Sequence, residues 1–321
     1  MVDSMTQSNT PKISKTTSQM PQLPGGSLWK ISLYVILSIA AVIAVIPFFW
    51  MISRSLMTLG ETINNSIVPA VPQWKNYEVA WREANFSLYF VNSVIITLIT
   101  ITGIIITSIL AGYAFGRMKF YGKNFVFAVL LATLMIPESV IMIPNFLTVA
   151  GRIFPLPIIT QAFPPSFDIC GGWISTCQTT WINTLPALTI PFLANAFSIF
   201  LLRQFFAQIP DELWDAARID GAGHFRFLWQ VCVPISRPAV LTVVLLTFIA
   251  AWNAFLWPLL VTTRPDWRPL MVGLYTFVSE AGAETHLMMA GACITILPML
   301  ILYFLTQRSF TEGIATTGLK G

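Results

Sequence analysis

Residues that could do chemistry are few in this chain of 321 residues, and none of them is spaced as an active site requires. Glu138 is the only carboxylate that clearly falls inside a long apolar stretch, and no second carboxylate stands near it. The two histidines, His224 and His286, are far apart and lie outside any HExxH pattern. No glycine-rich phosphate loop follows a strand pattern, so the sequence predicts no catalytic residue, nucleotide site, cofactor or metal centre.

Glu138 has two interpretations that the sequence leaves open. A carboxylate inside an apolar stretch marks a candidate translocation path, because an ionisable group is costly in lipid. Pro137 comes directly before it, however, and proline favours a helix break. At such a break the carboxylate would cap freed backbone groups or sit near the membrane surface.

The four cysteines do not form a CxxC pair. We interpret Cys232 and Cys293 as small apolar residues, since free cysteine is often buried. Cys170 and Cys177 lie in one short segment. If that segment is extracytoplasmic, a disulfide between them is a candidate, and the unbridged state stays equally open.

The composition indicates a membrane protein. Hydrophobic residues make up 55% of the chain and charged residues 10%, against about 25% charged residues in typical soluble domains. The net charge of +4 is small and its basic residues form no dense stripe, so nucleic acid is not an expected partner. Membrane lipid is.

Six uncharged or nearly uncharged stretches are long enough to cross the hydrocarbon as helices of about 20 residues. They are residues 31–53, 84–116, 124–150, 181–202, 238–263 and 286–307. We therefore predict an all-α polytopic membrane protein. It would begin with a disordered cytoplasmic tail (residues 1–27), a first transmembrane helix (28–53) and an extracytoplasmic loop (54–88). A core with five further helices (89–307) and a cytoplasmic tail (308–321) would follow.

Basic residues predict the orientation. With the N-terminus in the cytoplasm, the inner segments hold twelve Lys and Arg residues and the outer segments six. The bias is strongest in the tight loop that contains Arg117, Lys119 and Lys123. Because cytoplasmic loops of membrane proteins are enriched in these residues, both termini are predicted to be cytoplasmic.

Prolines lie inside most of the predicted spans, at positions 47, 137, 144, 186, 191, 258 and 298. Each removes a backbone donor and favours a kink, which neighbouring helices can compensate. The kinks suit either a static bundle or helices that move against one another, and the sequence does not choose between these two.

The loop at residues 203–237 is the most charged part of the predicted core. Pro210 suits the first position of a short helix, and Asp211 falls in its first turn, where the helix dipole favours anions. Gly221 is placed to end that helix, and Pro234 to end a second one. The loop is therefore predicted to be a helix, a turn and a second helix.

The first of these helices has small residues, Ala216 and Ala217, surrounded by charges. An apolar knob with a charged rim suits contact with another protein. The alternative is an amphipathic helix on the bilayer surface, but such helices are usually rich in Lys and Arg. Acidic residues such as Asp215 therefore favour a soluble partner protein.

At this loop the sequence resembles a known family. Asp215-Ala-Ala is followed by three residues, Gly221, nine residues and Val231-Cys-Val-Pro234. This spacing resembles the EAA motif of ABC importer permeases, with Asp in place of Glu and two Val residues in place of Ile and Leu. Further likeness to the carbohydrate-uptake branch lies at Asn92-Ser, Ala111 to Arg117 and Phe200 to Phe206. The C-terminal segment, Gln307 to Gly321, is similar to the tail of the maltose-system G-type permease. The resemblance covers residues 30–321, but the loop 152–178 is longer than the family leads us to expect.

The resemblance implies a mechanism and partners. The chain would be one permease of a heterodimer in a bacterial or archaeal cytoplasmic (inner) membrane. A separate ATPase dimer would receive the coupling positions Asp215, Ala216, Ala217, Gly221 and Pro234, and an extracytoplasmic solute-binding protein would deliver a sugar. Two alternatives are the same machinery for another solute such as glycerol phosphate, and a secondary carrier that ignores ATP.

Overall fold

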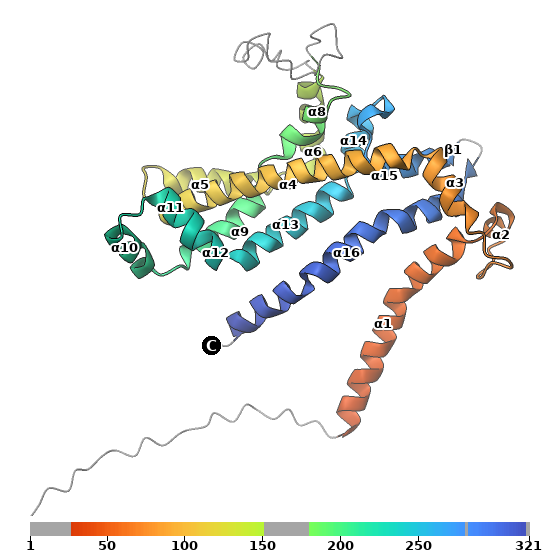
Figure 1. Ribbon diagram of the computed structural model, residues 1–321, viewed down its shortest axis with the longest axis horizontal. Coiled ribbons are helices and arrows are strands. Elements are labelled where there is room, and N and C mark those ends of the chain that lie inside the picture. The colour runs from red at the N-terminus through yellow and green to blue at the C-terminus, as the bar shows by residue number, and fades with distance from the viewer. Residues whose placement is uncertain (1–26, 151–179, 280–281, 319–321) are drawn as a thin grey trace, which may run out of the picture. The chain divides into compact units, whose positions relative to one another are not determined.

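The computed structural model describes residues 27–150, 180–279 and 282–318, and these form mainly α-helices (Figure 1). Cys170 and Cys177, most of the long loop and the N-terminal tail lie outside the described residues. The chain divides into two units, residues 1–49 and 50–321. Helix α1 (Ser27–Ser55) begins in the first unit, where its described side chains from Trp29 onward are all exposed and mostly apolar.

The second unit contains the other described elements. The α-helices after α1 are α2 (Leu59–Ile63), α3 (Lys75–Glu83), α4 (Phe86–Arg117), α5 (Lys123–Thr133), α6 (Glu138–Val149), α8 (Leu185–Thr189), α9 (Ala196–Ala207), α10 (Asp211–Ile219), α11 (His224–Phe227), α12 (Val233–Ile235), α13 (Arg237–Trp252), α14 (Leu256–Val261), α15 (Leu270–Leu274) and α16 (Thr285–Gly318). Short 3-10 turns lie at Ile190–Phe192, Pro265–Trp267 and Tyr275–Phe277, and a π-helical turn η2 at Leu228–Cys232. Strands β1 (Val278–Ser279) and β2 (Gly282–Ala283) pair antiparallel.

Among the described residues, three helices are long and apolar enough to cross a membrane alone. They are α1 over Trp29–Ser55, α4, and α16 over Thr285–Gln307, which agrees with the first, second and sixth predicted spans. The number rises to six only if each of three bent helix pairs counts as one span. The bends are 97° between α5 and α6, 42° between Leu185–Phe192 and α9, and 80° between His224–Ile235 and α13.

The predicted span over residues 124–150 is sharply bent, at the place where Pro137 was predicted to favour a kink. Helix α5 ends at Thr133 and α6 begins at Glu138, after Pro137 with an extended ψ of 138°. Proline has no N–H to continue the helical ladder and its ring crowds the preceding turn. The stretch 238–263 is likewise divided, into α13 and α14, by a break after Trp252.

Helix α4 contributes to all three buried clusters of the second unit. Ile104, Ile109 and Tyr113 pack with residues of α9, α11 and α13. Nearer its start, Phe86 and Tyr89 pack with α3, α15 and α16, while Ile96 joins the cluster of α8 and α14. Helix α4 therefore packs against most of the other helices of this unit.

Two glycines allow α4 and α9 to lie very close together. A Cβ atom added at Gly112 would stand 3.1 Å from Leu202 Cβ and 3.2 Å from the backbone nitrogen of Arg203. One added at Gly116, four residues on, would stand 3.3 Å from the carbonyl oxygen of Arg203. Small residues at this spacing are typical of tight helix pairs in membranes. This pair holds α9, which leads directly to the charged loop.

Candidate coupling site

Helix α10 lies between α9 and α11 in the charged loop (Figure 1), and all of its residues except Trp214 and Ala217 are exposed. Pro210 precedes its first residue and serves as the N-cap, one position earlier than predicted. Asp211 and Glu212 fall in the first turn and Arg218 in the last. This arrangement complements the helix dipole at both ends.

Gly221 ends this helix by adopting a left-handed conformation, with φ +76°. Its N–H donates to the carbonyl of Arg218 at 3.0 Å, and the N–H of Ala222 donates to that of Ala217 at 2.8 Å. These two bonds are the pattern of a Schellman motif, which satisfies the last free carbonyls of a helix. A Cβ atom at Gly221 would meet nothing within 4 Å, so the requirement for glycine here comes from the backbone alone.

The return segment is helical but irregular. After α11, the N–H of Val233 bonds to the carbonyl of Leu228, five residues back, in the π-helical turn η2. Pro234 follows in the short helix α12 and has no N–H, so the ladder cannot continue in its usual register. The chain then turns by 80° at Ser236 into α13. The sequence predicted the stop at Pro234 and missed the π turn before it.

Aromatic side chains hold α10 against the rest of the unit. Trp214 stacks on His224 with ring centroids 4.4 Å apart and planes 17° apart, and meets Phe227 edge-on at 5.0 Å. His224 Nδ1 is hydrogen-bonded to the hydroxyl of Tyr113 in α4 at 2.8 Å. Tyr113 in turn lies edge-on to Phe206 of α9. A continuous line of packed rings therefore joins α10 to α4.

Arg117, the last residue of α4, ties down the start of α10. Its guanidinium donates to the carbonyl oxygen of Ile209 at 2.8 Å and pairs with Asp211 at 2.9 Å. It also lies over the ring of Phe227, with 5.9 Å between the guanidinium carbon and the ring centre. The Arg117 side chain is only 9% exposed, whereas that of Asp211 is 85% exposed. The bond to the backbone is consequently the better shielded of the two.

The outer face of α10 combines acid with apolar residues. Asp215 and Ala216 are exposed, and so are the large apolar residues Leu213 and Ile219. Ala217 is half-buried and packs against the buried cluster with Trp214. Of the residues singled out in the sequence, Asp215, Ala216 and Gly221 thus share an exposed helix and turn. Ala217 faces inward, and Pro234 lies in the return segment.

Glu138 is placed at the helix break. It is the first residue of α6, directly after Pro137, and it is exposed. Its carboxylate makes no hydrogen bond or ion pair within the described residues. Nor do those residues contain a group of three or more His, Cys, Asp or Glu side chains able to hold a metal.

Sequence reasoning missed the residues that anchor this site. Tyr113 and His224 are separated by 111 positions, and Arg117 and Ile209 by 92. Arg117 and His224 were visible only as an inner-loop charge and an isolated histidine. One signal was available: Trp214 and His224 are close in sequence, on either side of the predicted turn, so contact between their rings could have been predicted.

A family model described as "Binding-protein-dependent transport system inner membrane component" matches residues 103–311. The chain is 31% identical to the sn-glycerol-3-phosphate transport system permease protein UgpE of Yersinia pestis, covering 78% of this chain and 82% of that protein. It is 30% identical to the arabinooligosaccharides transport system permease protein AraQ of Halalkalibacterium halodurans, covering 88% and 93%.

A solved structure shares the fold. It is described as a bacterial ABC transporter involved in the import of the acidic polysaccharide alginate, and one of its chains matches with a TM-score of 0.69 and 23% identity. The match covers 90% of this chain and all of that chain. The family match over residues 103–311 and the two relatives above show that the chain belongs to the inner-membrane permeases of binding-protein-dependent ABC transport systems.

Proposed function

We propose that this chain is the permease subunit of an ATP-driven sugar importer and couples to a separate ATPase through α10. It would form half of the translocation path, with a second permease as the other half. An extracytoplasmic solute-binding protein would deliver the sugar, in keeping with the family description. The observation that carries the proposal is the exposed, acidic and partly apolar face of α10, which is attached to α4 through Arg117 and His224.

The coupling residues have distinct roles in this proposal. Asp215 and Ala216 would contact the ATPase, because they are exposed and Ala216 permits close approach. Gly221 would set the end of the contacting helix, and Ala217 would fasten it from behind. Pro234 would set the bend that leads into α13.

Force would pass from the ATPase to the spans along the rings and the arginine described above. A displacement of α10 moves Trp214 and its stacked partner His224, which is hydrogen-bonded to Tyr113 of α4. Arg117 offers a second connection between the same two helices. Closure of the ATPases on ATP would in this way tilt α4 and the helices packed on it.

The proposed orientation places both termini and α10 in the cytoplasm. It is supported by the excess of Lys and Arg in the segments that would then be inside. The predicted boundaries stay as proposed, with the tail at residues 1–27, the first span at 28–53, the outer loop at 54–88, the core at 89–307 and the last tail at 308–321. A path-lining Glu138 and a disulfide between Cys170 and Cys177 also stay predictions.

The solute proposed is a sugar, because relatives along most of the chain include the arabinooligosaccharide permease named above. A second candidate is glycerol phosphate, because the UgpE relative is named for that solute at a similar identity. Affinity of the cognate solute-binding protein for oligosaccharides and for glycerol 3-phosphate would decide between them.

The coupling role can be tested at Gly221 with Gly223 as the matched control. Gly221→Val places a branched side chain at φ +76°, whereas Gly223 has an ordinary extended backbone with φ −82° and ψ 173°. Neither position has neighbours within 4 Å of an added Cβ. Both variants would be reconstituted with the ATPase and the binding protein in liposomes.

We expect Gly221→Val to lose at least tenfold in ATP-dependent uptake and to retain less ATPase on purification, because a branched residue is strongly disfavoured in the left-handed region. Gly223→Val should stay near the unmodified transporter. Unchanged uptake and unchanged ATPase retention in Gly221→Val would refute the docking role of α10.

A further inference from the structure

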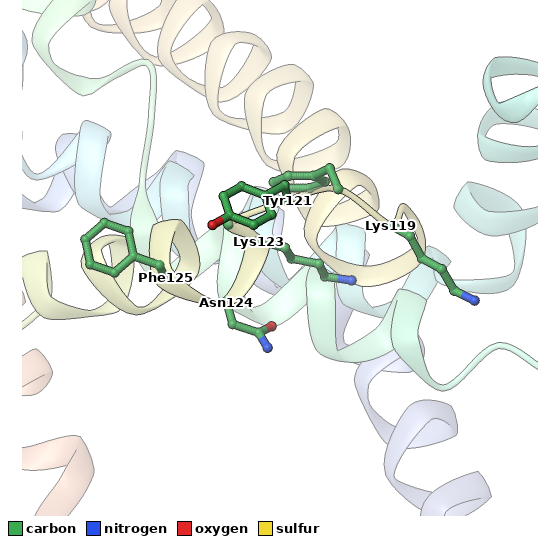
Figure 2. Close-up of a pocket in the computed structure, with 7 residues that line it drawn as sticks. Lys119, Tyr121, Lys123, Asn124 and Phe125 are labelled. Atoms are coloured by element: carbon green, nitrogen blue, oxygen red, sulfur yellow. The ribbon is translucent and has the colours of Figure 1, made fainter.

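The 118–125 loop, defined here as the tight turn after α4 together with the first three residues of α5, carries basic and aromatic side chains. Residues 119–125 line an open hollow on its surface. Figure 2 shows the Lys119 and Lys123 side chains extending to the same side of this hollow, with Phe125 on the opposite side. None of these residues belongs to the coupling site.

The place of the loop in the chain puts it at the membrane surface. Helix α4 has the length and composition of a membrane span and ends at Arg117. The loop follows at once, and α5 then carries the chain back into an apolar stretch. Helix α5 is long and apolar enough to cross a membrane only together with α6. We expect the short connection between α4 and this bent pair where hydrocarbon meets water, at the level of the lipid headgroups.

The loop carries positive charge that the protein itself does not neutralise. Lys119 is exposed and makes no hydrogen bond or ion pair within the described residues. Lys123 donates to the carbonyl oxygen of Met118 at 3.0 Å, which holds its ammonium beside the end of α4. Arg203 of α9 is close enough to act electrostatically on Lys123, which adds a further positive charge near the loop. This charge favours an anion.

Aromatic residues flank these cations. Tyr121 is fully exposed, Phe125 is 74% exposed and Phe120 is 44% exposed. Large apolar side chains are stable at such exposure when they rest in the headgroup region, where aromatic residues of membrane proteins gather. The first turn of α5 adds backbone N–H groups, because its N-cap is Gly122 and has no side chain to satisfy them.

We infer that the 118–125 loop binds the phosphate of an anionic phospholipid headgroup. Lys119 and Lys123 contact the phosphate, and Tyr121 and Phe125 hold the loop in the headgroup layer. The ligand is a lipid and not a free phosphate ion, because the exposed aromatics need an apolar boundary that free phosphate does not supply. The inference needs only the membrane location of the family and holds whichever solute the transporter carries.

The test uses the assembled transporter, stripped of lipid in a neutral detergent. Native mass spectrometry would follow its binding of phosphatidylglycerol and, separately, of phosphatidylcholine. The variants are Lys119→Gln, the Lys119→Gln/Lys123→Gln double variant, and Lys75→Gln as the control. Lys75 is also an exposed lysine beside an exposed tryptophan, Trp74, but lies in α3 within one turn of Glu78.

We expect each loop substitution to weaken phosphatidylglycerol binding roughly fivefold, as follows from about 1 kcal/mol per basic residue near an anionic surface. Phosphatidylcholine binding and the Lys75→Gln variant should be unchanged. Lys119→Gln removes no contact within the protein, so it tests the site even if the double variant does not assemble.

Three results would overturn the inference. The first is unchanged phosphatidylglycerol binding in Lys119→Gln. The second is an equal loss in Lys75→Gln, which would mean that overall charge and not this loop matters. The third is displacement of the lipid by inorganic phosphate at equal concentration, which would assign the loop to a free anion.

Discussion

The two ends of α4 hold their neighbours in different ways. Near its start, buried polar side chains hydrogen-bond to the backbone of another segment, whereas at its end Arg117 and packed aromatic rings hold the exposed helix α10. Asn92, 3% exposed, donates to the carbonyls of Asp266 and Arg268 at 2.8 and 3.0 Å. Ser93, 2% exposed, accepts from the N–H of Leu270 at 2.7 Å. We call this the Asn92 end of α4.

The Arg117 end is built differently. Its side chains Tyr113 and Arg117 reach a segment whose own outer face is exposed. Tyr113 is hydrogen-bonded to His224, on which Trp214 stacks, and Arg117 makes one backbone hydrogen bond and the ion pair with Asp211. Side-chain-to-backbone bonds in a dry environment are costly to break. Stacked rings can slide at less cost. The difference suggests that the Asn92 end is fixed while the Arg117 end can transmit small displacements.

The largest effect is expected at the Asn92 end. Asn92→Ala leaves two backbone carbonyls without donors in a buried place, which should cost about 2–4 kcal/mol of stability. Ser93→Ala, which removes a single bond, should cost less. Thermal unfolding of the purified transporter would measure both, with exposed Asn124→Ala as the control. Comparable midpoints for Asn92→Ala and Asn124→Ala would show that this end is not the rigid one.

A smaller effect is expected at the Arg117 end. Arg117→Gln weakens the bond to Ile209, a loss of roughly 1.5–3 kcal/mol for a charged donor. Asp211→Asn breaks the ion pair but should cost below about 1 kcal/mol, because the aspartate is well exposed. The decisive readout is the number of ATP molecules hydrolysed per solute imported. That ratio should rise in Arg117→Gln and stay constant in Asp211→Asn. A ratio that rose in Asp211→Asn and stayed constant in Arg117→Gln would show that coupling depends on the ion pair and not on the bond to Ile209.

The smallest effect is expected on stability at acid pH, through Glu61 of α2. Glu61 accepts hydrogen bonds from the N–H groups of Thr58 and Ala70 and from the Thr58 hydroxyl. These bonds, the backbone bond from Thr58 first, hold the pKa of this carboxyl below its usual value of 4.5. A lowered folded-state pKa stabilises the fold above pH 4.5, and that contribution is lost as pH falls through the folded-state pKa.

Glu61→Gln should therefore remove part of the acid sensitivity of the transporter. Thermal midpoints measured from pH 7 to pH 3 should converge for the two proteins at the acid end, with the unmodified protein falling more steeply below about pH 4.5. The change should be slight, because the group is exposed. Parallel curves over the whole range would show that Glu61 has no such role.

Local patterns in the sequence predicted a large part of this protein. Long apolar stretches identified α1, α4 and α16, because crossing hydrocarbon demands length and composition and little else. Gly221 was predicted as a helix end because only its own backbone conformation is at stake there. The acidic first turn of α10 was predicted for the same local reason. The sequence predicted a kink at Pro137, but it does not tell how far a proline bends a span, so the 97° size of the bend before Glu138 was not predicted.

Tertiary structure decided what the predicted parts are attached to. The bond from His224 to Tyr113 and that from Arg117 to Ile209 join positions that no periodicity or spacing connects. These residues meet because α4 packs closely on α9 at Gly112 and Gly116. The sequence by itself determined which helix could meet a partner. Only packing decided that this helix would be fastened to α4, because contacts between distant residues depend on the shape of the whole unit.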